Sequence, residues 1–201
     1  MGSLRAFDLP AMIAHFGCRY LFETGTGVGE GVAYALQFPF ERIFSVEIHP
    51  DVAATARDRF AGDPRVEILT QSSEAALLEV LPRISGDGPV LFWLDAHFPG
   101  ADYGFASYSD VADHDLRLPL ARELDAIGRL RYPSRDLVLV DDLRIYEDAA
   151  YEKGPMPASL QTLPPDLRNV DFAFRPPWSE THDAQRFLKD NGYLVLTPKP
   201  R

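Results

Sequence analysis

The feature that most constrains the fold of this chain is a glycine-rich stretch that follows an apolar run near the N-terminus. Residues 21 to 31 read LFETGTGVGEG, with Gly25, Gly27 and Gly29 directly after the run. Glycine reaches left-handed backbone conformations at low cost, so we expect a buried strand to end there in a tight turn that leads into a helix. Such a turn predicts a nucleotide-type ligand at the start of that helix.

The acid before the glycines indicates which ligand this is. In the dinucleotide fingerprint G-x-G-x-x-G, the third glycine would fall on Glu30. Glu23 would also repel a pyrophosphate, whereas it can hold the ammonium of S-adenosylmethionine, whose carboxylate suits a helix N-terminus. We therefore predict S-adenosylmethionine rather than NAD, bound by a loop that comprises Glu23, Thr24, Gly25, Thr26, Gly27 and Gly29.

Apolar runs alternate with helical patterns through residue 140, which is typical of a parallel sheet covered by helices. We expect strands at residues 19–23, 42–46, 65–69, 89–94 and 136–140, and helices at 29–38, from 49 to beyond 60, from 72 or 73 to 81, and at 116–131. Short β runs at 170–174 and 193–197 are expected to close the sheet as an antiparallel pair, with a polar and helix-compatible piece between them. The prediction is one Rossmann-like α/β domain over residues 1–201, with a doubly wound, seven-stranded, mostly parallel sheet.

Two segments interrupt this regular order. Residues 98–115 are rich in glycine, serine and aspartate and lack periodicity, so they form either a substrate loop or lid, or a disordered surface excursion. Between Gly154 and Pro177 there are six prolines, which exclude a long helix or a central strand. We expect this second segment to lie along one side of a substrate cleft.

Composition excludes several classes of function. The net charge of −10 and the presence of only three lysines make binding to a nucleic-acid backbone unfavourable. The single Cys18 permits no internal disulfide, and no apolar stretch has the length of a membrane span. We therefore expect a cytoplasmic protein, not associated with membranes, that acts on a small molecule; a homodimer is possible.

Further candidate cofactor residues follow the second and third strands. Glu47 comes 18 residues after Gly29, at the end of a strand, where an acid can accept both ribose hydroxyls of an adenosine. The alternative is an exposed glutamate at a strand end; we expect the cofactor role for Glu47 and for Ile48 beside it. Ser72 and Ser73 are either contacts to the adenine edge or a plain helix cap.

Acidic residues also follow the fourth and fifth strands. Asp95 follows one and Asp141 and Asp142 follow the other, and neighbouring parallel strands would bring these carboxylates together at one edge of the sheet. Converging like charges need a cation, and oxygen ligands favour Mg²⁺, Mn²⁺ or Ca²⁺. Taken singly, each acid could instead be a helix cap or a turn residue. His97, two residues after Asp95, is a candidate general base or further ligand, or a solvated side chain.

With these motifs in place, the chain resembles the class I S-adenosylmethionine-dependent methyltransferases. The resemblance covers residues 19–145: residues 23–29 (ETGTGVG) match the family's first motif, Glu47 its second-strand acid, and Leu94-Asp95 its fourth-strand motif. The three aspartates are similar to those of metal-dependent O-methyltransferases, including the macrocin-type sugar enzymes. The catechol enzymes of that group carry a catalytic lysine where this chain has Phe98.

The resemblance implies a specific activity. We expect O-methylation of a small hydroxylated molecule, such as a sugar or glycan unit, with S-adenosylmethionine as methyl donor and a divalent cation, Mg²⁺ in the first place, held by Asp95, Asp141 and Asp142. Asp95 and His97 are the expected catalytic residues. The alternatives are methyl transfer without a metal, and a cofactor-binding protein without transferase activity.

Overall fold

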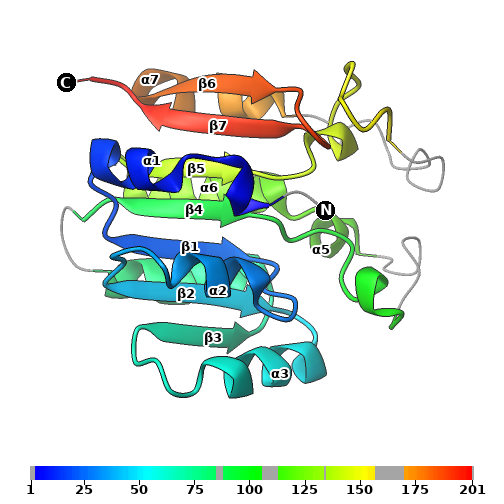
Figure 1. Ribbon diagram of the computed structural model, residues 1–201. Coiled ribbons are helices and arrows are strands. Elements are labelled where there is room, and N and C mark those ends of the chain that lie inside the picture. The colour runs from blue at the N-terminus through cyan, green and yellow to red at the C-terminus, as the bar shows by residue number, and fades with distance from the viewer. Residues whose placement is uncertain (1–2, 85–87, 106–112, 134, 157–169, 201) are drawn as a thin grey trace.

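The sheet sets the positions of all candidate site residues. The computed structural model describes residues 3–84, 88–105, 113–133, 135–156 and 170–200. Its seven strands are β1 (Tyr20–Thr24), β2 (Arg42–Glu47), β3 (Val66–Thr70), β4 (Val90–Leu94), β5 (Leu137–Val140), β6 (His182–Phe187) and β7 (Tyr193–Pro198). They lie side by side in the order β3-β2-β1-β4-β5-β7-β6 (Figure 1). The first five in this order are parallel and β7 is antiparallel to β5 and β6, which confirms the predicted fold class.

Helices cover both faces of the sheet. The α-helices are α1 (Leu9–Phe16), α2 (Glu30–Ala35), α3 (Pro50–Phe60), α4 (Ser73–Val80), α5 (His114–Arg117), α6 (Leu120–Arg131) and α7 (Trp178–Thr181). Short 3₁₀ helices occur at Leu4–Ala6, Leu81–Arg83, Ala101–Tyr103, Leu143–Ile145 and Asp171–Phe174. Asp8 and Ser72 cap α1 and α4 through their side-chain oxygens, which satisfies backbone N–H groups that a helix start leaves unpaired.

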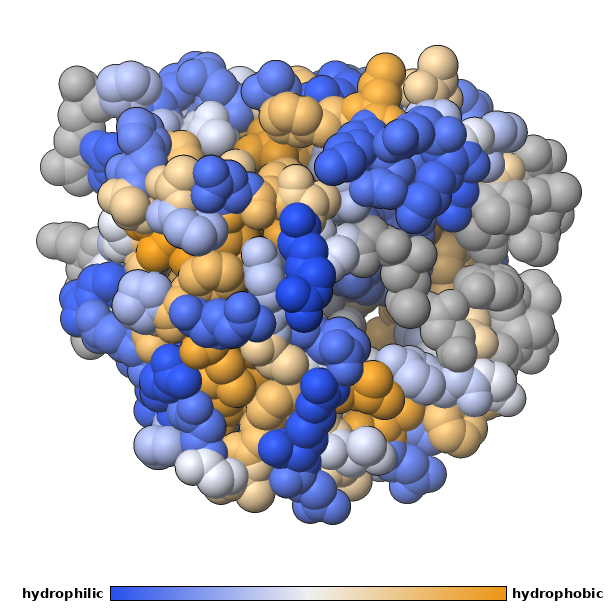
Figure 2. Space-filling model, in the orientation of Figure 1, coloured by the Kyte–Doolittle hydropathy of each residue, from blue (hydrophilic) through white to orange (hydrophobic). Residues whose placement is uncertain are grey.

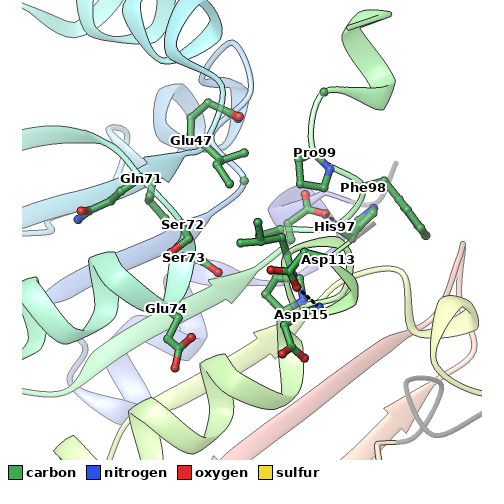
Figure 3. Close-up of a pocket in the computed structure, with 18 of the residues that line it drawn as sticks. Glu47, Gln71, Ser72, Ser73, Glu74, His97, Phe98, Pro99, Asp113 and Asp115 are labelled. Carbon is green, nitrogen blue, oxygen red and sulfur yellow. Dashed lines mark hydrogen bonds and ion pairs between the residues drawn. The ribbon is translucent and has the colours of Figure 1, made fainter. Parts of the chain in front are cut away.

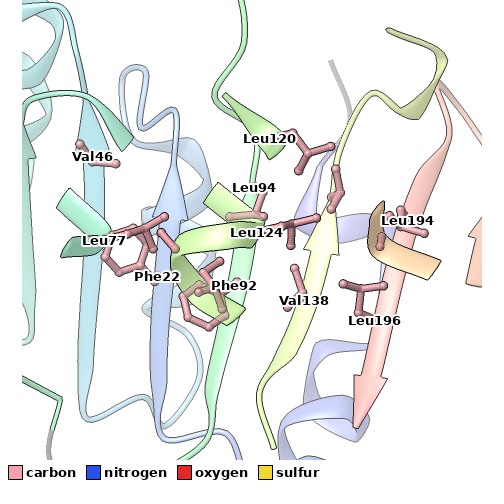
Figure 4. Close-up of a cluster of buried hydrophobic side chains, with 14 of the residues drawn as sticks. Phe22, Val46, Leu77, Phe92, Leu94, Leu120, Leu124, Val138, Leu194 and Leu196 are labelled. Atoms are coloured by element: carbon pink, nitrogen blue, oxygen red, sulfur yellow. The ribbon is translucent and has the colours of Figure 1, made fainter. Parts of the chain in front are cut away.

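The hydrophobic core has two layers because each central strand is buried on both faces. Alternate residues of one strand point to opposite faces, so Phe22 of β1 and Phe92 of β4 pack on one side of the sheet and Leu21 and Leu91 on the other. The first layer meets α4 and α6, where Leu77 and Leu124 are fully buried (Figure 4). The second layer meets α1, α2 and α3. Continuous apolar strands of this kind are typical of parallel sheets.

The predicted strand at residues 170–174 is wrong. The predicted strand at residues 170–174 is a 3₁₀ helix, Asp171–Phe174, whose aromatic residues pack against the core from outside the sheet. The strand that pairs with β7 is β6, in the piece that we expected to be polar and helix-compatible. β6 is an edge strand with most of its residues solvent-exposed, so it lacks the apolar alternation that marks a half-buried strand.

The predicted helix at residues 116–131 is in fact two helices. Pro119 lies between α5 and α6, and a proline there has no N–H to donate and clashes with the preceding turn. The predicted helix at residues 29–38 is shorter, since α2 ends at Ala35. Residues 106–112 and 157–169 lie outside the described part, so parts of the predicted lid and of the proline-rich segment are not placed.

The surface is mixed in polarity. Hydrophilic and hydrophobic residues are interspersed over the face shown in Figure 2. In the part of the chain that the structure describes, no helix is both long enough and apolar enough to cross a membrane.

Candidate functional site

A cavity of about 210 Å³ opens where the parallel strands end. Its wall contains eight of the predicted site residues, namely Gly25, Gly27, Glu47, Ile48, Ser72, Ser73, Asp95 and His97. The serines and Glu47 lie on one side of the cavity and His97 on the other, beside Phe98 and Pro99 (Figure 3). The other predicted residues, Glu23, Thr24, Thr26, Gly29, Asp141 and Asp142, are not part of this wall.

The glycine loop needs glycine for two separate reasons. Gly25, Gly27 and Gly29 all have positive φ, at 78°, 53° and 86°, where other residues are strained. A Cβ at Gly25 would also lie 2.6 Å from the backbone oxygen of Asp95, and a Cβ at Gly27 would lie 2.2 Å from the hydroxyl of Tyr103. The loop therefore lies directly against the end of β4, which brings the cofactor motif and the acidic motif into one cavity.

Glu47 is held in place by the backbone of its neighbours. The N–H of Gly27 donates to its Oε2 at 3.0 Å, and the N–H of His49 donates to its Oε1 at 2.9 Å. Each carboxylate oxygen can accept more than one hydrogen bond, so both remain able to accept a ribose hydroxyl. Glu47 thus lies at the end of β2 and in the cavity wall, and its contact with an adenosine stays a prediction.

Glu23 lies behind the cavity wall. Its side chain is 2% exposed and accepts a hydrogen bond of 2.5 Å from Ser45, whose hydroxyl also lies 2.6 Å from that of Thr26. On the other side, a Cβ at Gly31 would lie 1.8 Å from Glu23 Oε1, so the start of α2 closes over the carboxylate. Burial, with a smaller contribution from the charge of Glu47, raises the pKa of Glu23 to about 8 against the hydrogen bond from Ser45.

This buried acid predicts a pH-dependent stability. The unfolded chain loses the Glu23 proton near pH 4.5, whereas the folded chain keeps it to about pH 8, so stability is fully present below pH 4.5 and falls as the pH rises through this window. Glu23→Gln should remove that fall. We expect denaturant unfolding to show a variant more stable than the wild type at pH 8, by a few kcal/mol at about 1.4 kcal/mol per pKa unit, and similar to it at pH 4.5.

The exposed Asp58 provides the control for this experiment. Asp58→Asn removes a carboxylate from the surface of α3 and should leave the difference between the two pH values as in the wild type. A Glu23→Gln variant with the wild-type pH profile would show that Glu23 ionises normally in the folded protein.

Acidic side chains gather at the ends of β4 and β5, as predicted. Burial, followed by the charges of Asp141, Glu23 and Asp142, raises the pKa of Asp95 well above its usual range. Burial and the charge of Asp142 likewise raise the pKa of Asp141. Neighbouring buried carboxylates do not both ionise at low cost unless a cation lies between them. Without a cation, one of them keeps its proton.

Asp142 contacts His97, and its charge also acts on Asp95 and Asp141. Its backbone has a φ of 51°, and its Oδ2 lies 3.5 Å from His97 Nε2, while Asp95 Oδ1 lies 3.6 Å from His97 Nδ1. Burial raises the pKa of Asp142, but the hydrogen bond from His97 and the charges of His97 and Arg144 outweigh it and lower that pKa. The imidazole thus bridges the predicted catalytic and metal-binding residues.

The acidic side chains at the ends of β4 and β5 are in part suited to hold a cation. Both carboxylate oxygens of Asp141 are buried and have no hydrogen-bond partner among the described residues. A coordinated cation would compensate the cost of burying them. An all-oxygen set suits Mg²⁺, Mn²⁺ or Ca²⁺. In the described part of the chain, however, no group of three or more histidine, cysteine, aspartate or glutamate side chains is placed so that it could hold a metal ion. Asp95 and Asp142 both contact His97, so each would have to exchange that contact for one with the ion.

The predicted loop over residues 98–115 borders the cavity. Phe98, Pro99, Gly100 and Tyr103 belong to the wall, and Phe105 stacks on His49 with ring centroids 3.9 Å apart. The described half of the loop therefore packs across the glycine loop and the end of β2. Its role as a lid stays a prediction.

Two buried polar residues were not found from the sequence. Ser45, which joins Glu23 to Thr26, is a small polar residue in an apolar strand. Glu123 is 1% exposed and lies on the apolar face of α6, among leucines at helical spacing. In both cases the signal was a polar residue at a position where the pattern calls for an apolar one.

Solved structures share this architecture. The SAH-bound methyltransferase of Podospora anserina aligns with 100% of this chain and 80% of its own, with a TM-score of 0.64 and 15% identity. The O-methyltransferase of Bacillus cereus in complex with SAH aligns with 99% of this chain and 82% of its own, with a TM-score of 0.57 and 13% identity. The chain has the Rossmann-like methyltransferase fold. No family model and no curated protein matches its sequence.

A third structure has the same methyltransferase fold. It is a candidate caffeoyl-CoA O-methyltransferase of Staphylococcus aureus, with a TM-score of 0.66, 11% identity and coverage of 99% of this chain and 85% of its own. At these identities the likeness concerns the fold, and the chemistry of the site has to be argued from its own residues.

Proposed function

We propose that this protein is an S-adenosylmethionine-dependent O-methyltransferase that acts on a small hydroxylated molecule, such as a sugar or glycan unit, with the help of a divalent cation. The observation that carries the proposal is the single cavity whose wall joins the glycine loop and Glu47 to Asp95 and His97. Two neighbours of the same fold bind SAH (S-adenosylhomocysteine), the product that S-adenosylmethionine leaves after methyl transfer.

The cofactor side of the cavity suits an adenosine and an amino-acid group. Glu47 can accept the ribose hydroxyls, Ile48 offers an apolar surface beside them, and Ser72 and Ser73 face the same space from the start of α4. The glycine loop lets the ligand approach the backbone, because no side chain stands at Gly25 or Gly27. The bound cofactor would supply an electrophilic methyl, whose bond to sulfur breaks, with its electron pair left on sulfur, as the acceptor oxygen forms the new bond.

The acidic side of the cavity suits a hydroxyl acceptor. His97 lies in the cavity wall and in its neutral form can take the hydroxyl proton, while Asp95 beside it orients the acceptor for in-line attack. The three aspartates would hold the cation, once Asp95 and Asp142 exchange their contacts with His97 for contacts with the ion. A divalent ion there would neutralise the paired carboxylates and lower the pKa of an acceptor hydroxyl.

One observation favours methyl transfer without a metal as the second candidate. His97 already contacts both Asp95 and Asp142, so the acidic groups are partly satisfied by the protein itself. In that case Asp95 and His97 alone would position and deprotonate the acceptor. The two candidates differ in whether a chelator stops the reaction.

The metal half of the proposal predicts the behaviour of Asp141→Asn. This change removes one negative charge at nearly constant volume, so Mn²⁺ affinity, measured by calorimetry, should fall about 10-fold or more, and methyl transfer to a panel of sugars and phenols should slow. SAH affinity should stay within about twofold, because Asp141 is not part of the cavity wall.

His97→Ala provides the contrast. It removes the proposed base and leaves the carboxylates in place, so turnover should drop while Mn²⁺ still binds. Full activity of Asp141→Asn in the presence of chelator would exclude the metal mechanism and leave the metal-free methyltransferase.

A further inference from the structure

The described half of the loop after β4 carries two aromatic side chains to the loops after β1 and β2. In these residues, 98–105, which we call the aromatic turn, the Gly100 carbonyl accepts hydrogen bonds from the N–H groups of Tyr103 at 3.2 Å and Phe105 at 3.0 Å. The N–H of Phe98 donates to a carbonyl of α5 at 3.0 Å. These backbone hydrogen bonds fix the positions from which Tyr103 and Phe105 extend, and the function proposed so far uses neither side chain.

Tyr103 reaches the glycine loop. A Cβ at Gly27 would lie 2.2 Å from the Tyr103 hydroxyl, so this hydroxyl occupies the place where a side chain at Gly27 would begin. Tyr103 belongs to the cavity wall and is 40% exposed. It therefore presents surface to a ligand at the same point as the glycine loop does.

Phe105 reaches the residue that opens α3. Its ring stacks on the His49 ring, with centroids 3.9 Å apart and an interplanar angle of 14°. Gly27 and His49 are the two residues whose N–H groups hold the Glu47 carboxylate, at 3.0 and 2.9 Å. The aromatic turn thus contacts both residues that fix Glu47, although Pro99, near its start, lies across the cavity from Glu47 (Figure 3).

A ribose held by Glu47 would need a hydrogen-bond donor that Tyr103 can provide. A carboxylate only accepts hydrogen bonds, so Glu47 takes the protons of the ribose hydroxyls. The ribose oxygens then have lone pairs left for a donor, and a phenolic O–H is one. Tyr103 brings such a group to Gly27, whose own N–H already donates to Glu47.

We infer that Tyr103 is a cofactor-binding residue whose hydroxyl donates to the ribose held by Glu47, and that Phe105 anchors the aromatic turn for this contact. The inference rests on the proposed function, because it concerns the same cofactor. Its competitor is a packing role, in which Tyr103 only rests on the glycine loop. Packing needs the ring, whereas binding also needs the hydroxyl, so removal of that one oxygen separates the two roles.

The experiment compares Tyr103→Phe with the wild type by calorimetry with SAH. The change keeps the ring and removes one hydrogen bond, so SAH affinity should fall about 2- to 10-fold while the melting temperature stays unchanged. Tyr132→Phe is the matched control, because Tyr132 is 53% exposed, lies outside the cavity wall and donates to Glu180 at 3.4 Å. The control should bind SAH as the wild type does. Wild-type affinity in Tyr103→Phe would overturn the inference and leave the proposed function standing.

A second ligand tests whether the hydroxyl acts on the ribose. Methylthioadenosine has the adenosine and the sulfur of SAH but lacks its amino-acid group, so Tyr103→Phe should weaken the binding of both ligands by the same factor. A loss for SAH alone would place the hydroxyl at the amino-acid group and overturn the ribose assignment. Absence of SAH binding to the wild type would overturn the proposed function itself.

Phe105→Ala tests the anchor. It removes the stack on His49, so SAH affinity should fall by up to about 10-fold. Because Phe105 acts through Tyr103, the loss caused by Tyr103→Phe should be smaller in the Phe105→Ala background than in the wild type. Fully additive losses, or wild-type SAH affinity in Phe105→Ala, would overturn the anchoring role of Phe105.

Discussion

Gly27→Val should abolish most of the SAH affinity of this protein while the fold persists. The new Cβ would lie 2.2 Å from the Tyr103 hydroxyl, in the cavity wall, and the residue would have to adopt a φ of 53°, which valine rarely does. Overpacking typically costs about 1–3 kcal/mol, so at about 1.4 kcal/mol per factor of ten we expect a loss of roughly 5- to 150-fold. Calorimetry with SAH measures this loss, and NAD should show no binding to the wild type.

The control for this variant is Gly154→Val. Gly154 has a φ of 83°, and a Cβ there would meet nothing within 4 Å, so the control carries the backbone strain without an effect on the cavity. Adding Tyr103→Phe to Gly27→Val should relieve the clash with the hydroxyl without restoring SAH binding, since valine still occupies the cavity. Wild-type SAH affinity in Gly27→Val, or tight NAD binding to the wild type, would contradict the cofactor assignment.

Asp136→Ala should cause the largest loss of stability of any single change considered. Asp136 lies just before β5 and is fully buried. Arg131 donates two hydrogen bonds of 2.9 Å to it, one from Nε to Oδ2 and one from a terminal nitrogen to Oδ1. The N–H of Val90 donates to the same carboxylate at 2.8 Å. Removal of one partner from a buried pair leaves the other charge uncompensated and typically costs about 3–5 kcal/mol.

Denaturant unfolding measures this effect, with Asp183→Ala as the control. Asp183 lies on the exposed edge strand β6 and pairs with Lys199 at 3.9 Å, so its removal should cost less than about 1 kcal/mol. Asp136 is at the opposite end of the strands from the cavity, so a milder Asp136→Asn variant that still folds should keep wild-type SAH affinity. Equal stability of Asp136→Ala and Asp183→Ala would show that the buried pair contributes little.

The sequence by itself determined the alternation of the first five strands with helices and the position of the cofactor loop. Alternation of apolar runs and amphipathic segments is a local property, as is the need for glycine at Gly25, Gly27 and Gly29, so both can be recognised without a structure. The convergence of Asp95 and Asp141 followed from topology, since parallel neighbouring strands end at the same edge of the sheet. The roles of these residues in binding and catalysis stay predictions.

Edge strand β6 was assigned wrongly from sequence for a physical reason. An edge strand has one neighbour and is largely exposed to solvent, so neither of its faces requires an apolar pattern. Its residues form a strand because β7 offers a row of unpaired backbone groups. The VDFAF run at residues 170–174 has the expected alternation but meets no such partner in the described structure.

Only the tertiary structure decided how the acids of the site are arranged. Glu23 is in the predicted motif, yet the approach of Gly31 places it behind the cavity wall, and Asp142 contacts His97 at 3.5 Å. The positions of strands and helices depend on patterns along the chain, whereas side-chain direction depends on contacts between segments distant in sequence, and these exist only once the chain has folded.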